Sequence, residues 1–498
     1  MTDARPTDHS IDSSDPYDVV VVGGGNAGHC AALSAAERGR RVLLLEKGRR
    51  GEHGGNTFYT AGAMRVTHGD VDDVRDLVDD DERLDDTVLP PYTAEEYLAD
   101  MARVTDGRND PDLTRTLVEE SEPTLRWMKT HGLRFRLMYE RQADRSQGKH
   151  VFWGGLAIGS TGGGKGLVEQ HEAAAAAAGV EIRYGVAGTS LLAEDGRVTG
   201  LRVRDAEGRE GELRAESVVL AAGGFEADAE MRREHLGEGW QRAKVRGTPL
   251  NTGDMLRAAL EAGAAPYGDW STCHSVAWDA NAADEGDREL TNQLTRGGYP
   301  IGIVVNSEGH RFLDEGADFR NYTYARYGAL ILAQPGGIAY QLFDATTRPM
   351  LRTEDYDAPG TSEVVADSLD ELAAELGIDA AALTGTIAEF NASIDTSVPF
   401  DPAVKDGRRA AVTPPKSNWA QPLDRPPYHA FPVTCGITFT FGGLRADTCG
   451  RVLTESGAPL DGLFVCGEML GGLFSGNYPG GTGLVSGAVF GRRAGSLA

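Results

Sequence analysis

The chain has 498 residues, 65 of them glycine, and its 75 acidic and 49 basic residues give a net charge of −26 at pH 7. This length allows two domains, and the negative charge argues against nucleic acid or an anionic membrane as a partner. The five cysteines form no CxxC or CxxCH pattern, so they predict no haem, iron–sulfur or other metal site and favour a reducing, cytoplasmic compartment.

Residues 1–16 are polar and acidic without an apolar signal core, which predicts a disordered tail. No apolar run reaches the length of a transmembrane helix. The chain is therefore expected in the cytoplasm, with attachment to a membrane through a partner protein as the alternative.

The first ordered element predicts a dinucleotide site. The β-branched run at 19–22 is typical of a buried parallel strand, and Gly23, Gly25 and Gly28 follow it as a GxGxxG pattern. These glycines allow a tight turn, a close approach of backbone to a pyrophosphate, and close packing of helix on strand. A helix over 26–39 then directs its N-terminal N–H groups toward the phosphates.

A second strand over 41–45 ends in Glu46, at the distance from the glycines that suits a bond to a ribose hydroxyl. An acid here argues against a ribose phosphate but fits both FAD and NAD. The small and hydroxyl residues of 54–62 come directly afterwards, where the extended body of a flavin would run. The sequence therefore predicts FAD.

Helical and extended patterns alternate as far as residue 265, including an Ala-rich helix over 169–178 and a buried strand from 217 that ends in Gly223 and Gly224. Short strands are expected at 180–184, 188–193, 198–205 and 211–213. From 266 to 427 aromatic residues and prolines become more frequent, and a helical stretch covers 370–391.

Several stretches in both regions carry a family resemblance: Trp270–Asp279, Asp314–Ala325, Pro415–Ala420, Thr434–Arg445 and Asn477–Leu484. On these motifs the sequence resembles the flavoproteins of the fumarate reductase/succinate dehydrogenase group over residues 17–495. Within that group it is most similar to the tricarballylate dehydrogenases, relatives of the bacterial 3-ketosteroid dehydrogenases.

The resemblance implies an α/β fold, in which a Rossmann-like FAD-binding domain (17–265 and 428–498) carries an inserted α+β substrate-capping domain (266–427). FAD would be held without a covalent bond, because His53 is misplaced for the histidine linkage of succinate dehydrogenases. The predicted cofactor residues are Gly23, Gly25, Asn26, Ala27, Gly28, Glu46, Lys47, Gly54, Gly55, Asn56, Thr57, Gly62, Val186, Ala222, Gly223, Gly224, Gly467, Glu468, Gly483, Leu484 and Val485.

Arg320 is the predicted proton-transfer residue, because it follows a segment similar to the one that leads to the catalytic arginine of fumarate reductases. The other interpretations of Arg320 are a carboxylate clamp and a structural ion pair. Arginine is a poor base in water, so Tyr322 and Tyr324 are the alternatives for the proton-transfer role.

The predicted substrate contacts are His274, Thr438, Thr440, Arg445 and Tyr478, with a buried core histidine as the alternative for His274. Thr440 matches the threonine of the fumarate reductase His-His-Thr stretch, but both histidines are absent. Tyr478 stands where those enzymes have a substrate arginine and resembles the tyrosine of the ketosteroid dehydrogenases. These departures favour a substrate larger than fumarate.

The resemblance therefore implies FAD-dependent dehydrogenation of a carbon–carbon single bond in a small carboxylate, with tricarballylate to cis-aconitate as the leading reaction. A fumarate reductase-like or ketosteroid dehydrogenase-like enzyme with another substrate is the first alternative. The second is a flavoprotein subunit of an electron-transfer complex. For the leading reaction and for the electron-transfer subunit, the resemblance implies that a separate iron–sulfur or membrane protein accepts the electrons, since this chain has no cluster motif of its own.

Overall fold

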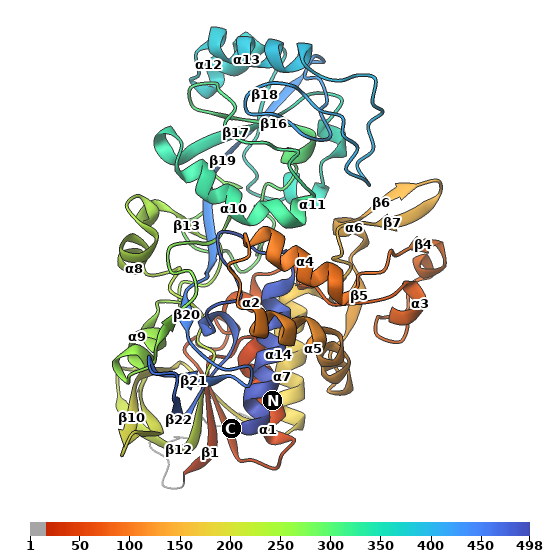
Figure 1. Cartoon of the computed structure of the whole chain (residues 1–498). Coiled ribbons are helices and arrows are strands. Elements are labelled where there is room, and N and C mark those ends of the chain that lie inside the picture. Colours follow the sequence, from red (N-terminus) through yellow and green to blue (C-terminus); the bar gives the residue numbers. More distant parts are fainter. Residues whose placement is uncertain (1–15) are drawn as a thin grey trace, which may run out of the picture.

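The structure is a computed structural model that describes residues 16–498, so the tail predicted for 1–16 lies, apart from Pro16, outside the described residues. Figure 1 shows a lower part, built on one sheet with helices against it, and an upper part built around a second sheet. Among the helices of residues 16–498, none combines the length and the apolar character needed to cross a membrane.

A parallel sheet forms the centre of the lower part. Strand β1 (Tyr17–Val22) lies between β2 (Val42–Glu46) and β12 (Glu210–Leu220), and both pairings are parallel. Beyond these, β9 (Glu181–Tyr184) pairs with β2 and β22 (Pro459–Val465) with β12. The continuous apolar run of β1 is explained by burial on both faces of the sheet, as in other parallel sheets.

Three helices lie side by side next to this sheet: α1 (Asn26–Ala36), α7 (Gly163–Ala177) and α14 (Thr482–Leu497) (Figure 1). A Cβ atom at Gly491 of α14 would lie only 2.4 Å from the carbonyl oxygen of Ala27. Glycine at this position therefore allows the last helix of the chain to pack closely against the first.

Strand β12 changes partners along its length. Its first half pairs in antiparallel fashion with β11 (Arg197–Asp205), which pairs with β10 (Val186–Glu194), and its second half pairs in parallel with β1. The sequence predicts two strands here, at 211–213 and from 217. The structure joins them, because one continuous strand can satisfy the backbone groups of both neighbours.

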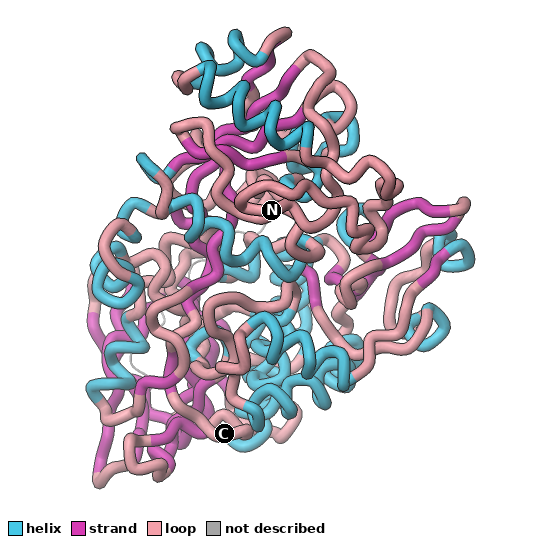
Figure 2. Tube along the Cα trace, turned by 45° about the horizontal axis from the view of Figure 1, so that its top comes forward, coloured by secondary structure: helices cyan, strands magenta, loops and turns pink. Residues whose placement is uncertain are grey.

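The upper part is built around a six-stranded sheet with the long β19 (Tyr428–Thr440) at its centre. Figure 2 distinguishes its strands, in magenta, from the helices and the many loops around them. The other strands are β13 (Lys244–Val245), β15 (Cys273–Asp279), β16 (Ile303–Asn306), β17 (Ile338–Phe343) and β18 (Val364–Ala366). The predicted limits of the cap at 266 and 427 stay a prediction, although β19, which begins at 428, belongs to this sheet.

The helical stretch predicted over 370–391 is two helices, α12 (Leu369–Leu376) and α13 (Ala380–Ala392). Gly377 ends the first helix in a left-handed conformation with φ 68°, a common helix terminator. The predicted stretch is therefore helical but interrupted once, because its apolar periodicity continues across a glycine that ends the first helix.

The remaining elements are short apart from α4, α5 and α10. They are α2 (Gly55–Phe58), β3 (Ala63–Met64), α3 (Val71–Val74), β4 (Thr87–Val88), α4 (Ala94–Val104), α5 (Pro111–Thr130), β5 (Phe135–Leu137), α6 (Tyr139–Gln142), β6 (Ala143–Ser146), β7 (Lys149–Phe152), β8 (Ile158–Ser160), α8 (Ala229–Met231), α9 (Asp254–Glu261), β14 (Pro266–Tyr267), α10 (Arg320–Leu332), α11 (Thr353–Tyr356), β20 (Gly443–Leu444) and β21 (Arg451–Leu453).

Candidate active site

One continuous cavity extends from the ends of the parallel strands to the second sheet. Most of the predicted cofactor residues line it: Gly23, Gly25, Asn26, Ala27, Glu46, Lys47, Gly55, Asn56, Thr57, Val186, Ala222, Gly223, Gly467, Glu468, Gly483 and Leu484. The cavity is lined at its other end by side chains from the upper part. A long ligand could therefore lie on the lower part and present one end to a substrate held by the upper part.

The glycine turn after β1 has no room for side chains. Gly23 has a φ of +113°, and a Cβ atom there would lie 2.2 Å from the carbonyl oxygen of Ala221. A Cβ atom at Gly28 would lie 1.9 Å from the carbonyl oxygen of Gly23. The turn thus brings bare backbone and the N-terminus of α1 to the cavity, an arrangement that binds phosphate groups.

Glu46 lies at the end of β2 and is buried. Its carboxylate accepts hydrogen bonds from the backbone N–H of Gly48 at 2.6 Å and of Gly24 at 3.1 Å. Burial raises the pKa of Glu46, while these N–H donors oppose that change. The bonds fix the acid at the wall of the cavity, in the position predicted for a ribose contact.

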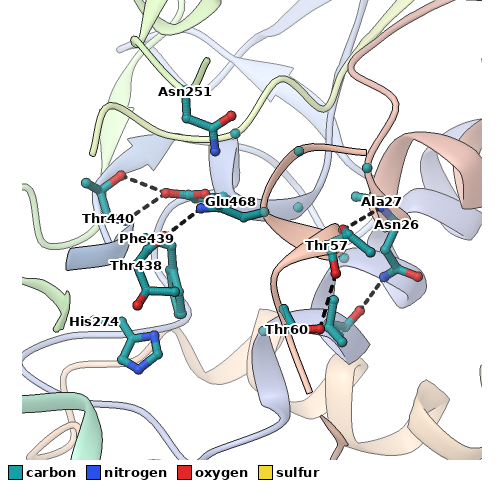
Figure 3. Close-up of a pocket in the computed structure, with 18 of the residues that line it drawn as sticks. Asn26, Ala27, Thr57, Thr60, Asn251, His274, Thr438, Phe439, Thr440 and Glu468 are labelled. Carbon is teal, nitrogen blue, oxygen red and sulfur yellow. Dashed lines mark hydrogen bonds between the residues drawn. The ribbon is translucent and has the colours of Figure 1, made fainter. Parts of the chain in front are cut away.

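Asn26 joins three segments that are far apart in sequence. Its backbone N–H donates to Oγ1 of Thr57 at 2.9 Å, and its side-chain amide donates to the carbonyl oxygen of Leu484 at 2.8 Å (Figure 3 shows Asn26 and Thr57). His171 contributes a further bond to the Asn26 amide oxygen, at 2.9 Å. The first and last helices of the chain therefore form this wall of the cavity together.

Four arginines line the cavity: Arg141, Arg246, Arg296 and Arg320. Arg296 is paired with Asp279 at 2.7 Å. Asp355 has its Oδ1 3.8 Å from Arg141 and is also paired with Arg352 at 2.7 Å. Burial lowers the pKa of Arg141 to about 9 and also lowers the pKa of Arg246 and of Arg320. Positive charge is thus concentrated where water is scarce, which favours an anionic ligand with several carboxylates.

Aromatic rings form the wall beside these arginines. The hydroxyl oxygens of Tyr324 and Tyr478 lie 2.5 Å apart, and both rings contact His274, as does Phe439. His274 is 2% exposed, and neither of its ring nitrogens has a hydrogen-bond partner among residues 16–498. Burial lowers the pKa of His274 well below its usual value, so the ring is neutral and free to bond a ligand in the cavity.

Thr438 and Thr440 both line the cavity, but their side chains already have partners. Oγ1 of Thr438 accepts a bond from Arg246 at 2.8 Å. The N–H and hydroxyl of Thr440 donate to Oε1 of Glu468 at 2.7 and 3.1 Å, as Figure 3 shows. Thr438 is therefore bonded to an arginine at the proposed substrate end of the cavity, and Thr440 is bonded to an acid at its cofactor end.

Other predicted residues lie away from this cavity. The Tyr322 hydroxyl is bonded to Asp100 and to the Gly154 carbonyl, beside a second cavity, and the Arg445 guanidinium lies over the ring of Tyr267. His53 is paired with Glu172 at 3.0 Å, also outside the cavity lining. Five predicted cofactor residues are absent from the lining: Gly28, Gly54, Gly62, Gly224 and Val485.

Several lining residues carry no sequence motif and were not predicted. They include Arg141 and Arg246 at the substrate end and Asn251 at the cofactor end. Glu226, which bonds the lining residue Asn56, was also missed. For Glu226 a signal was present, because an acid two residues after a buried strand and its two glycines is well placed to reach the cofactor.

The comparisons with known proteins agree with this arrangement. The FAD binding domain family matches residues 18–485. Fumarate reductase (cytochrome) from Shewanella frigidimarina is 29% identical over 489 residues, covering 97% of this chain and 77% of the relative. The 3-oxosteroid 1-dehydrogenase of Mycobacterium tuberculosis is 27% identical over 563 residues, covering 95% of this chain and 96% of the relative.

The solved structure of the open conformation of a flavocytochrome c3 fumarate reductase superposes with a TM-score of 0.71 at 27% identity, covering 97% of this chain and 78% of that one. The predicted α/β fold with an FAD site is thereby confirmed, and the bare glycine turn fits the cofactor. The chain belongs to the FAD binding domain family and is an FAD-dependent oxidoreductase of the group that includes the fumarate reductases and the 3-ketosteroid dehydrogenases.

Proposed function

We propose that this enzyme dehydrogenates a carbon–carbon single bond of a small polycarboxylate, with tricarballylate to cis-aconitate as the leading reaction. The observation that carries the proposal is the group of Arg141, Arg246 and Arg320 around one end of the cavity. A tricarboxylate brings three negative charges, and planar guanidinium groups are the side chains best suited to bind carboxylates through paired hydrogen bonds.

Arg246 is held ready for such a contact. Its Nε donates to Oγ1 of Thr295 at 3.0 Å and its Nη1 to Oγ1 of Thr438 at 2.8 Å. Two fixed donors leave the guanidinium little freedom to reorient, and its remaining N–H groups stay available to a ligand. A preorganised cation binds its anion with less loss of side-chain entropy.

Arg320 is the proposed proton acceptor. It begins α10, its Nη2 donates to the backbone carbonyl of Arg141 at 3.1 Å, and it lines the cavity. Burial lowers its pKa first, and the nearby charge of Arg352 lowers it further, so the neutral guanidine, which is the form that can accept the substrate's proton, is easier to reach here than in water. When bound, FAD supplies the hydride-accepting chemistry. The chain's own residues orient the substrate and take its proton.

A second candidate is a 3-ketosteroid dehydrogenase-like reaction. The hydroxyl pair of Tyr324 and Tyr478 favours it, because a tyrosine supported by a second hydroxyl can bond a substrate carbonyl. The aromatic neighbours Phe439 and Phe474 add apolar surface beside that pair. Against it stand Arg141, Arg246 and Arg320, because a neutral substrate would bring no charge to pair with their guanidinium groups.

The deciding experiment is anaerobic mixing of the FAD-loaded enzyme with tricarballylate, succinate, fumarate, urocanate and a 3-ketosteroid, with flavin absorbance as the readout. We expect bleaching by tricarballylate and little change with the steroid. Bleaching by the steroid alone would replace the first proposal with the second. If the dithionite-reduced flavin is reoxidised only by fumarate or urocanate, the enzyme works as a reductase.

We also propose that a separate iron–sulfur or membrane protein accepts the electrons. The support is that this chain contains no cluster motif, so electrons must leave the flavin for an acceptor elsewhere. Turnover with an artificial one-electron acceptor but not with dissolved oxygen would agree with this arrangement. Rapid turnover with oxygen alone would contradict it.

A further inference from the structure

Two buried acids, Glu226 and Glu468, meet beneath the cofactor end of the cavity. Glu226 is completely buried, Glu468 lines the cavity, and the charge of each acid acts on the other. Oε2 of Glu226 is buried and has no hydrogen-bond donor among residues 16–498. An ionised carboxylate can only accept hydrogen bonds, so a buried carboxyl oxygen without a donor, in the neighbourhood of a second acid, favours a proton at this place.

The other oxygen of each acid is held by donors from different segments. Oε1 of Glu226 accepts from the side-chain amides of Asn56 and Asn251, both at 2.6 Å. Oε1 of Glu468 accepts from the N–H and hydroxyl of Thr440. Figure 3 shows Glu468 between Asn251 and Thr440. These bonds engage one oxygen of each acid and leave Oε2 of Glu226 without a donor.

The backbone is shaped to admit this pair. A Cβ atom at Gly224 would lie 2.1 Å from Oε1 of Glu468 and 2.2 Å from Oγ1 of Thr440. At Gly223 a Cβ atom would lie 2.3 Å from the Asn251 amide nitrogen. The two glycines that the sequence assigned to the cofactor thus make room for the bonds that hold the acids.

No cation neutralises the pair. Within residues 16–498, no Lys, Arg or His side chain forms an ion pair with either carboxyl group. The charge of Glu226 acts on Arg232, whose guanidinium donates to backbone carbonyls including that of Glu226, and on the buried thiol of Cys273. Burial raises the pKa of Glu226 to about 7 and that of Glu468 well above its usual value, and the neighbouring acid adds to the latter. Like charges in one buried site rarely ionise together.

We propose that Glu226 and Glu468 share one proton at neutral pH and that this shared proton sets the charge that bound FAD meets at this wall of its cavity. With the proton, the pair carries one negative charge; below neutral pH it takes up a second proton and becomes uncharged. Negative charge near a flavin opposes its reduction, so the pair makes the reduction potential depend on pH. Glu226, which does not itself line the cavity, acts through Glu468 as a positioning residue.

The test uses the FAD-loaded full-length protein with ¹³C-carboxyl-labelled glutamate and infrared spectroscopy above neutral pH. We expect a protonated carboxyl C=O band in the wild type that shifts with the label. The band of the pair should shift or be lost in Glu226→Gln and in Glu468→Gln, because the amide replaces the acid with which the proton is shared. The control Glu455→Gln, at an exposed site, should keep the band.

A second readout separates a shared proton from simple structural support. The visible absorption bands of the oxidised flavin are followed against pH, and in the wild type we expect an inflection near neutrality that both Gln variants lose. Either variant that retains FAD suffices for the comparison. A band that keeps its wild-type position and intensity in a folded Gln variant overturns the proposal. In the wild type alone, absence of both the labelled band and the inflection also overturns it.

Discussion

Nη1 of Arg246 donates a 2.8 Å hydrogen bond to the hydroxyl oxygen of Thr438, although 192 residues separate the two. Arg246 follows β13 and Thr438 lies near the end of β19, and these strands pair side by side. The bond connects a residue that carries no motif to one that the family resemblance singled out. Thr438 therefore serves the substrate side through the arginine that it orients.

Replacing Arg246 with Gln should weaken the binding of a tricarboxylate by about 1.5–3 kcal/mol, the usual value of a hydrogen bond to a charged group. That corresponds to a rise in KM of roughly ten- to a hundredfold. Thr438→Val should have a smaller effect, because the cation remains. Arg445→Gln is the matched comparison, since that guanidinium lies outside the cavity. A large rise in KM for Arg445→Gln together with an unchanged Arg246→Gln would reverse the assignment.

Replacing Arg320 with Lys should preserve the bound FAD and lower kcat by about 10²–10⁴-fold, the usual range for a lost acid–base group. Lys has a point charge without the planar fork, so it cannot reproduce the geometry. Stopped-flow measurement of flavin reduction gives the rate. Tyr322→Phe should retain the rate, because its hydroxyl is engaged with Asp100. If Tyr324→Phe abolishes flavin reduction while Arg320→Lys does not, Tyr324 is the residue that accepts the substrate proton.

The variant His274→Phe should distinguish two interpretations of His274, a substrate contact and a buried core histidine. The unpaired buried imidazole costs about 1–3 kcal/mol of stability, so Phe should raise the free energy of unfolding while weakening substrate binding. The folded-state pKa of His274 is depressed, so below the unfolded value of about 6.5 only the unfolded chain takes up the proton. The free energy of unfolding of the wild type therefore decreases as the pH is lowered. The difference in this free energy between His274→Phe and the wild type should grow from pH 7.5 to pH 5.5 in urea titrations. If His274→Phe binds substrate as the wild type does, His274 is a core residue and not a substrate contact.

Gly28→Ala should prevent formation of the FAD site, because its Cβ atom would lie 1.9 Å from the Gly23 carbonyl oxygen. We expect colourless or insoluble protein. Gly385→Ala is the matched control: it lies inside α13, and a Cβ atom there meets no atom within 4 Å. That change should raise stability by about 0.5–1 kcal/mol with full FAD content. Yellow, stable Gly28→Ala protein would contradict the role given to the turn.

Wild-type protein should release intact FAD into the supernatant on acid precipitation. The nearest candidate for a covalent link, His53, is paired with Glu172 and lies outside the cavity lining. His53→Ala should therefore leave the FAD content unchanged. Flavin that stays with the precipitated wild-type chain, and is released only in His53→Ala, would show a covalent bond.

The cofactor end of the site could be predicted from sequence because its determinants are local. Gly23, Gly25 and Glu46 lie within one strand–helix–strand unit, where spacing alone fixes their positions. The substrate end could not be predicted in this way. Arg141 comes from the short helix α6 and Arg246 from the loop after β13, and only the tertiary fold brings them together. Arg445, by contrast, lies within a matching motif but away from the cavity.

The packing of α14 on α1 has a consequence for synthesis. Residues 17–46 leave the ribosome early, but the strand and helix that complete their site span 459–497. At about 5–20 residues per second, the early unit waits roughly 20–90 s for these partners. The side-chain N–H of Asn26 lacks the Leu484 carbonyl throughout that interval, and the face of α1 at Ala27 lacks Gly491. Capture of the cofactor by the complete site therefore follows the synthesis of residues 459–497.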